Sequence, residues 1–225
     1  MRILGYSIVA VMLASGSAGA AVTYTDGTFT PSNWGFELVT LAAGGTSSAT
    51  QVAGGNPGMA RQLTNSVNGG GTVWGVSRYG TTNATRYEPM TTGAILSVDF
   101  AIDYRFVQGA GGDGHALVLA AKQGTAVFGA AYTVTGSSGA WGTYAITGVT
   151  AADFTRLDGA AGGIDFSATG APIRFGFAVG NSSTGTPYSN TVMYDNFEVV
   201  VHNVPAPGVG LLAGAGLLTL ARRRR

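Results

Sequence analysis

The sequence predicts an all-β protein, folded as a two-sheet antiparallel jelly-roll sandwich and flanked by an N-terminal signal helix and a C-terminal transmembrane helix. Three observations support this prediction. Short stretches in the middle of the chain alternate apolar and polar residues with a period of two, which is typical of strands with one buried face. Clusters of Gly, Ser, Thr and Asn separate these stretches and favour turns. Uncharged apolar segments lie at the two ends of the chain.

The clearest strand covers residues 94–106, AILSVDFAIDYRF. Its alternation predicts a buried face formed by Leu96, Val98, Phe100, Ile102, Tyr104 and Phe106. The opposite face is polar, with Ile95 as the one exception. Residues 173–179 alternate in the same way, with Ile173, Phe175, Phe177 and Val179 inward. Further strands are expected at 22–30, 34–41, 72–79, 115–121, 126–134, 141–147 and 191–202.

The segments between these strands are expected to be polar turns. They are rich in Gly and Ser and cover residues 42–50, 65–72, 134–141 and 180–190. A short helical turn is expected near residues 150–154. Eight or nine strands of this kind favour two packed antiparallel sheets, and a jelly roll in particular. The chain has no cysteine, so the fold must be stabilised by its core rather than by disulfides.

The first twenty residues have the pattern of a secretory signal peptide. Arg2 supplies a positive start, residues 3–13 an apolar run, and Ala18-Gly19-Ala20 a small-residue cleavage site. Cleavage is therefore expected at Ala18, Ala20 and Ala21, after passage through the secretion translocon. An ordinary buried N-terminal helix is the alternative. The pattern divides the chain into a signal peptide (1–20), a β-sandwich domain (21–203) and a tail (204–225).

The tail combines two prolines, an apolar span and a basic end. Residues 204–221 contain no charged side chain. The length of this uncharged segment is at the lower limit for a membrane-spanning helix. Pro205 and Pro207 keep the segment before the span extended. Positive charges resist translocation, so we expect the last four residues to stay on the cytoplasmic side: Arg222, Arg223, Arg224 and Arg225. The tail is therefore predicted to be a transient membrane anchor.

This tail resembles the PEP-CTERM sorting signal of Gram-negative bacteria that make extracellular polysaccharide. The motif is Val204-Pro205-Ala206-Pro207-Gly208, followed by the apolar span 209–221 and the arginine cluster 222–225. Ala206 stands where the family usually has Glu. The resemblance implies that an exosortase, a membrane-embedded processing enzyme, recognises the tail. The protein would then be membrane-anchored before processing and lie at the cell surface or in the extracellular matrix afterwards. A plain C-terminal membrane anchor is the alternative.

A second resemblance covers the body of the chain. Residues 26–39, DGTFTPSNWGFELV, resemble the first strands of secreted bacterial jelly rolls of the carbohydrate-binding and laminin-G-like kinds. Residues 54–62, 165–183 and 194–201 resemble domains that precede PEP-CTERM tails. These likenesses imply a jelly-roll fold and an extracellular polysaccharide as partner.

The charge of the body excludes one class of partner. The chain has 12 basic and 11 acidic residues, and five of the basic ones belong to the processed ends. The body therefore keeps seven basic residues against eleven acids, a net charge of −4. A nucleic-acid-binding domain has a basic footprint, so no nucleic acid is expected as a partner.

A metal site is suggested by the last strand. Alternation places Asp195 on the face of Met193, Phe197 and Val199, where a carboxylate needs a cation or a hydrogen-bonding partner. The resemblance to carbohydrate-binding jelly rolls implies a structural calcium held by Asp195, with Asp26 and Glu37 near the first strand. The alternatives are an arginine partner, or backbone N–H groups at a sheet edge.

Sugar contacts are predicted from one aspartate and two aromatic residues. Asp113 lies in the Gly-rich segment 109–119, which resembles the Asp-Gly turn of legume-lectin-like domains and is equally a plain turn. Trp74 and Trp141 are the candidates for exposed rings that stack on sugars, whereas Trp34 is expected in the core. Tyr79, Tyr87 and Tyr132 could join such a surface, although most of these aromatic residues are expected to be core or half-buried.

No catalytic activity is expected. His115 and His202 are far apart in the sequence and have no partner motif. Asp99 and Asp103 would lie about 13 Å apart along one strand, which is too far for glycosidase chemistry. The sequence thus predicts an exported surface or matrix protein with a structural or adhesive, polysaccharide-binding role. The alternatives are a carbohydrate-binding module with a defined sugar site, marked by two exposed aromatics on one sheet face, and a secreted glycoside hydrolase.

Overall fold

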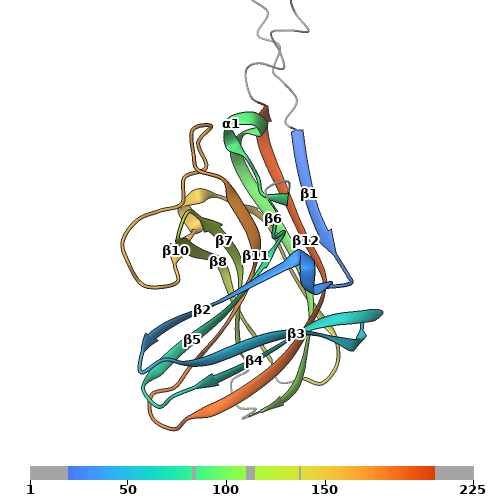
Figure 1. The fold of residues 1–225 in the computed structure, drawn as a ribbon, viewed down its shortest axis with the longest axis vertical. Helices are drawn as coiled ribbons and strands as arrows, with labels where there is room; N and C mark the ends of the chain where they lie inside the picture. The colour runs from blue at the N-terminus through green and yellow to red at the C-terminus, as the bar shows by residue number, and fades with distance from the viewer. Residues whose placement is uncertain (1–19, 83–84, 110–114, 137, 206–225) are drawn as a thin grey trace, which may run out of the picture.

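The computed structural model describes residues 20–82, 85–109, 115–136 and 138–205. These residues form two six-stranded antiparallel sheets packed face to face (Figure 1). The first, here called the β12 sheet, contains β1 (Ala20–Asp26), β3 (Gly45–Gly55), β4 (Gly58–Val67), β6 (Gly93–Gly109), β9 (Gly142–Val149) and β12 (Tyr188–Pro205). The second, the β11 sheet, contains β2 (Trp34–Ala42), β5 (Gly71–Tyr79), β7 (His115–Gln123), β8 (Ala126–Thr135), β10 (Thr155–Arg156) and β11 (Ile173–Ser182). The predicted jelly-roll sandwich is confirmed.

Each sheet has a defined order of hydrogen-bonded strands. The β12 sheet runs β3-β4-β12-β6-β9, and β1 also pairs with β12, beyond the end of β4. The β11 sheet runs β10-β8-β7-β11-β5-β2. In the described residues, the short helices between strands include η1 (Pro31–Asn33), α1 (Pro89–Thr92) and η3 (Ala151–Asp153). The last of these is the helical turn expected near residues 150–154.

The main core lies between the sheets and is rich in aromatic rings. Ile173, Phe175, Phe177 and Val179 all point inward and are at most 3% exposed, as alternation predicted. The ring of Phe177 lies 4.8 Å from that of Tyr194 and 5.8 Å from that of Trp34, measured between centroids. Trp34 is therefore a core residue, which confirms its predicted place.

The alternation of β6 is interrupted near its start, contrary to the sequence prediction. Ile95 is 6% exposed and belongs to the core, whereas Leu96 is 56% exposed. The cause is a shift in the pairing with β12, where His202 faces Ser97 but Asn203 faces Ile95. Such a bulge inserts one residue into a strand and reverses which side chains point inward before it. Val98, Phe100 and Ile102, after the bulge, are buried as predicted.

Strands β3 and β4 were not predicted, because residues 42–50 and 65–72 were interpreted as turns. Residues 45–50 and 65–67 of these segments instead form the open end of the β3–β4 hairpin at the edge of the β12 sheet. Asn65 occupies an inward position where an apolar residue would have signalled a strand. It donates hydrogen bonds of 2.9 Å to the carbonyl of Val179 and to Oδ1 of Asn181. Hydrogen bonding therefore replaces apolar burial at this position.

The two ends of the chain lie almost wholly outside the described residues. This applies to the expected signal helix at residues 1–19, and to Ala206 and the rest of the tail, so both stay predictions. Val204 and Pro205 form the end of β12. Within the described part of the chain, no helix is long and apolar enough to cross a membrane.

Candidate functional site

The outer face of the β11 sheet, which points away from the main core, has an apolar floor. A second cluster of buried residues covers this face, with Val39 and Trp74 packed against it; its members are Val76, Val118, Ala120, Val127, Leu157 and Ala178. Outward positions of a sandwich are usually polar. The members of this cluster are at most 7% exposed, so the cluster supports Trp74 from below and is not itself an exposed surface.

The ring of Trp74 packs closely on this face because its neighbour on β11 has no side chain. The Cα of Trp74 pairs with that of Gly180, which pairs in turn with Ala116. A Cβ atom on Gly180 would lie 2.5 Å from Cζ3 of the indole, so the ring packs directly on the backbone of β11. The half-buried ring therefore keeps a defined place on the floor.

Tyr132 is brought to the same face by a bulge in β8. The pairing of β7 with β8 shifts between Leu117 and Leu119, and Ala131 has a φ of 57°. Tyr132 follows directly and is 65% exposed. Trp74 and Tyr132 together line two neighbouring hollows of about 190 and 170 Å³. We call these two hollows, which share Trp74 and Tyr132, the aromatic groove.

Polar groups line both hollows of the aromatic groove. The first is bordered by Asn181 and Tyr188, whose hydroxyl donates a 2.9 Å hydrogen bond to the carbonyl of Ser182. The second is bordered by Thr155 and Asp153. Asp153 is the only carboxylate among the described lining residues of these hollows, and it accepts hydrogen bonds from Thr150. The groove thus combines two rings with hydrogen-bonding groups and lacks the carboxylate pair of a glycosidase among its described lining.

His115 closes the inner wall of the first hollow. It is 2% exposed, and its Nε2 lies 2.7 Å from Oγ1 of Thr135. Its ring stacks on Phe106 at 6.3 Å and meets Tyr194 edge-on. Nδ1 is buried without a hydrogen-bond partner in the described structure. Burial lowers the pKa of His115 to about 4, so the ring is neutral at pH 7.

This burial predicts acid sensitivity. Between pH 7 and pH 5 we expect His115 to remove about 2 kcal/mol from the free energy of unfolding. The unfolded chain takes up the proton near pH 6.5 and the folded chain only near pH 4, so stability falls as the pH drops through this window. Urea unfolding of the wild type and of His115→Gln at both pH values measures the effect. Equal losses in the two proteins would show that another group is responsible.

Of the three residues predicted to hold calcium, Glu37 lies on a different sheet from Asp26 and Asp195, whose carboxylates are close enough to interact electrostatically. Glu37 lies on the outer face of the β11 sheet, where it pairs with Lys122 and, at 3.5 Å, with Arg78. Asp26 accepts hydrogen bonds from Thr28, Phe29 and, at 2.8 Å, from Nε1 of Trp34. Within the described residues, no group of three or more His, Cys, Asp or Glu side chains could hold a metal.

Alternation predicted that Asp195 shares a face with Phe197, and this prediction is wrong. The pairing of β12 with β6 shifts between Asp195 and Glu198, and Asn196 has a φ of 48°. Asp195 is buried on the outer side of the β12 sheet, opposite Asp103, and accepts hydrogen bonds from the backbone N–H groups of Asn56 and Asn196. Burial raises the pKa of Asp195, and these two N–H groups act in the opposite direction. The oxygens of Asp195 already accept hydrogen bonds from these two N–H groups. Calcium binding at Asp195 stays a prediction.

The two tryptophans predicted to contact sugar lie on different sheets. Trp141 directly precedes β9, at the edge of the β12 sheet, and the guanidinium of Arg105 lies 5.0 Å from its ring centroid. Asp113 lies outside the described residues. Sequence reasoning named Tyr132 only among several aromatics and missed Gly180, which no sequence pattern distinguishes from the other 36 glycines.

Comparison with known proteins supports the fold. No protein-family model and no curated protein matches the sequence. The family 11 carbohydrate-binding module of a cellulosomal cellulase from Clostridium thermocellum is 17% identical, with a TM-score of 0.50 over 81% of this chain and 95% of that chain. A family 11 module from the same organism, in complex with a β-1,3-1,4-mixed-linked tetrasaccharide, is 13% identical, with a TM-score of 0.49 over 81% and 96% of the two chains. At these identities the likeness concerns the fold alone.

Proposed function

We propose that this protein is a non-catalytic β-sandwich that binds polysaccharide in the aromatic groove. The observation behind the proposal is the placement of Trp74 and Tyr132 on one sheet face, where both line the same pair of hollows. Aromatic rings pack well on the apolar faces of sugars, and polar groups beside them can accept or donate hydrogen bonds to hydroxyls. The name of the family 11 module, a carbohydrate-binding module of the same fold, supports this reading.

The alternative of a glycoside hydrolase has less support. Hydrolysis needs two carboxylates about 5 to 9.5 Å apart across the bond that is cleaved. Among the described residues that line the two hollows, Asp153 is the only one with a carboxylate. Asp103 and Asp195 do face each other, but they lie on the other sheet, and their oxygens accept hydrogen bonds from Asn56 and Asn196.

Export and sorting complete the proposed function. Ala20 pairs with Asn203, so β1 and the end of β12 lie side by side, and the signal peptide and the tail join the body at the same end (Figure 1). The proposed exosortase would release the body from the membrane by processing the tail. Intact-mass spectrometry in hosts with and without an exosortase tests this proposal. We expect loss of the arginine tail only in the first host, and a tail kept in both would contradict it.

Binding is tested by affinity electrophoresis of the full-length protein in gels that contain neutral or acidic polysaccharides. We expect slower migration in at least one gel relative to a gel without polysaccharide, because a polymer engages both rings at once. Incubation of each polysaccharide with the protein, followed by a reducing-sugar assay, should show no cleavage. Unchanged migration with every polysaccharide would contradict binding, and released reducing ends would contradict the non-catalytic role.

A further inference from the structure

Basic side chains gather on the same face of the β11 sheet as the aromatic groove, farther along the strands. The outward residues of β5 run from Trp74 through Val76 to Arg78, and those of β7 run from Val118 through Ala120 to Lys122. On β11, between them, the outward row ends at Arg174, whose Cα pairs with that of Lys122. Each strand therefore leads from the apolar floor to a cation. We call Arg78, Arg86, Lys122 and Arg174 the basic end.

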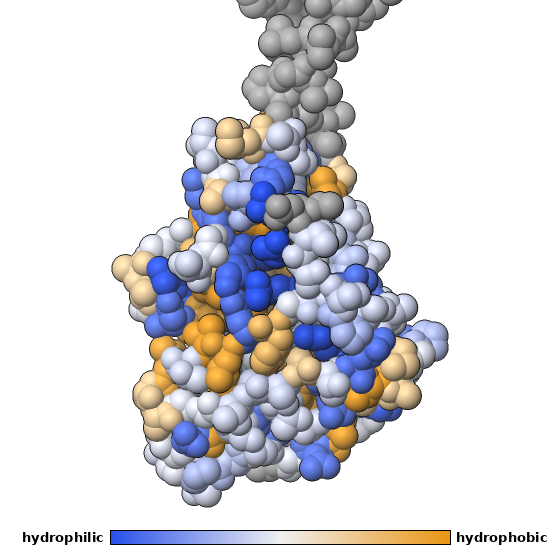
Figure 2. Space-filling view, viewed as in Figure 1, coloured by the Kyte–Doolittle hydropathy of each residue, from blue (hydrophilic) through white to orange (hydrophobic). Residues whose placement is uncertain are grey.

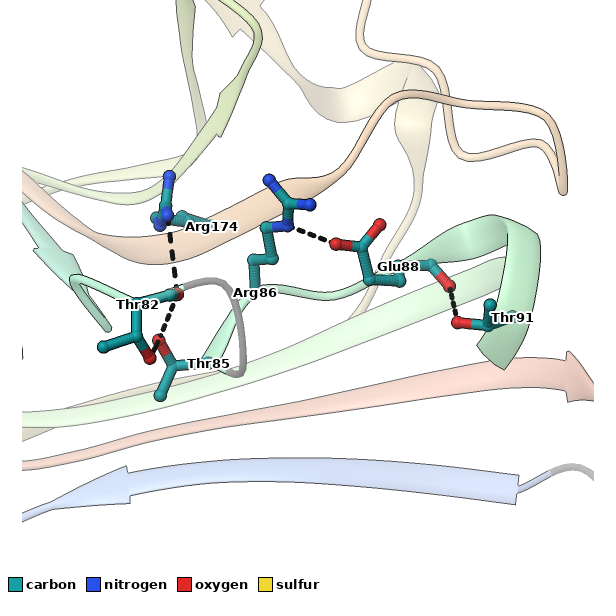
Figure 3. Close-up of polar contacts among 6 residues, drawn as sticks. All are labelled: Thr82, Thr85, Arg86, Glu88, Thr91 and Arg174. Carbon is teal, nitrogen blue, oxygen red and sulfur yellow. Dashed lines mark hydrogen bonds and ion pairs between the residues drawn. The ribbon is translucent and has the colours of Figure 1, made fainter.

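Arg86 joins this group through a short bridge to β11. Tyr87 exchanges backbone hydrogen bonds of 2.8 and 2.9 Å with Ile173, and both of these side chains point into the core. Arg86 therefore lies beside Arg174 on the outer side, and it pairs with Glu88, which lies farther from Arg174 (Figure 3).

Arg174 differs from its neighbours because it has no ion pair among the described residues. Arg78 and Lys122 share the carboxylate of Glu37, and Arg86 pairs with Glu88. Among the described residues, Arg174 donates a single long hydrogen bond, of 3.4 Å, from Nη2 to the carbonyl of Thr82 (Figure 3). Its Nε is buried and has no hydrogen-bond partner in this part of the chain. A guanidinium has five donors, so most of the hydrogen-bonding capacity of Arg174 is unused.

The charge of this region is opposite to that of the body. Three of the four cations of the basic end pair with two carboxylates, those of Glu37 and Glu88, which leaves an excess of positive charge. The body as a whole has seven basic residues against eleven acids. Figure 2 shows strongly hydrophilic residues gathered in the middle of the face in view, with hydrophobic residues directly below them. A positive region beside an apolar groove favours an anionic ligand over a neutral one.

We propose that the ligand of the aromatic groove is an acidic polysaccharide, whose carboxylate or sulfate groups bind at the basic end with Arg174 as the principal contact. This inference rests on the proposed polysaccharide-binding function. A guanidinium binds such anions through two parallel N–H···O bonds. Arg174 and Gly180 are six residues apart on β11, which corresponds to about 20 Å along the strand. Gly180 is the residue on which the ring of Trp74 packs. An extended polymer can span this distance and a single sugar cannot.

The test compares polymers that differ in charge but share a backbone. Polygalacturonate and its methyl ester differ in the carboxylate, and dextran sulfate and dextran differ in the sulfate. Affinity electrophoresis of the full-length protein is run in all four. We expect slower migration in at least one acidic polymer, with an affinity at least about tenfold higher than for its neutral partner. The acidic polymer that retards the protein more identifies the anion as carboxylate or sulfate.

Substitution of Arg174 supplies the second measurement. Arg174→Gln should reduce the affinity for the acidic polymer about tenfold and leave any binding to the neutral polymer unchanged. Arg174→Lys keeps the charge and should retain part of the affinity. The matched control is Arg156→Gln, since Arg156 is an arginine of the same sheet that pairs with Asp158 at 2.5 Å. Melting temperatures of all variants show whether they fold.

The outcomes separate this inference from the function on which it rests. Equal binding to an acidic polymer and its neutral partner would overturn the inference and leave polysaccharide binding intact. The same holds if Arg174→Gln binds like the wild type, or if Arg156→Gln loses as much affinity. Retardation by none of these four polymers overturns the inference, and the wider set of polysaccharides then decides whether the groove binds any at all.

Discussion

Replacement of Trp74 by Ala is expected to reduce the affinity for polysaccharide at least about 30-fold, as for the central aromatic residue of a binding surface. Trp74 lines both hollows of the aromatic groove, so its loss removes a stacking surface from each. The ring packs on Gly180 and on the outer apolar cluster rather than in the main core. Isothermal titration calorimetry with the best polysaccharide from the gels measures the affinity.

The control for this substitution is Trp141→Ala. Trp141 was an equal candidate in the sequence, but it lies at the edge of the other sheet beside Arg105. We expect its replacement to leave the affinity within about twofold of the wild type, because surface changes away from a site have small effects. A large loss with Trp141→Ala and none with Trp74→Ala would place the binding surface on the β12 sheet and contradict the proposed groove.

Replacement of Ile95 by Ala is expected to lower the free energy of unfolding by about 2 to 4 kcal/mol. Ile95 is 6% exposed and belongs to the main core, so truncation leaves a cavity between the sheets. Replacement of the adjacent Leu96, which is 56% exposed, should change it by only about 0.5 kcal/mol. Urea unfolding at pH 7 measures both values.

The pair is informative because simple alternation along 94–106 predicts the reverse. Without the bulge opposite His202 and Asn203, Leu96 would point inward with Val98 and Ile95 would face solvent. A larger loss of stability for Leu96→Ala than for Ile95→Ala would therefore show that β6 keeps an unbroken register with β12. The two variants remove similar apolar volumes, so each is the control of the other.

Long-range pairing accounts for most of the differences between the sequence prediction and the structure. The buried face of 173–179 was predicted correctly because β11 keeps regular register with both of its neighbours along this segment. The faces of Leu96 and Asp195 were wrong because each lies beside a shift in the pairing of β6 with β12. The paired residues of β6 and β12 at these shifts are about 100 residues apart in the chain. The alternation within one segment therefore cannot show how the two strands are aligned.

The same reason applies to the candidate site. An apolar outward position on β7 or β11 has the same period as a core position, so sequence alone cannot assign Val118 or Ala178 to a second, outer cluster. In the sequence, Trp74 and Trp141 were equal candidates for exposed rings, and Tyr132 was named only among several other aromatics. Pairing of β5 with β11 and a bulge in β8 brought Trp74 and Tyr132 to one face, and left Trp141 at the edge of the other sheet.

By itself the sequence determined the class of fold, the approximate place of nine strands and the inward face of β11. These features depend on residues within one segment, where a period of two is enough to decide which side is buried. It also determined the net negative charge of the body, which is a property of composition. The tertiary structure alone decided the β3–β4 hairpin, the bulges, the aromatic groove and the cluster of cations around Arg174. The place of the hairpin depends on the pairing of β4 with β12, which is distant in the chain, and the groove and the cations depend on the pairing of β11 with β5 and β7. Such registers follow from packing of the whole domain.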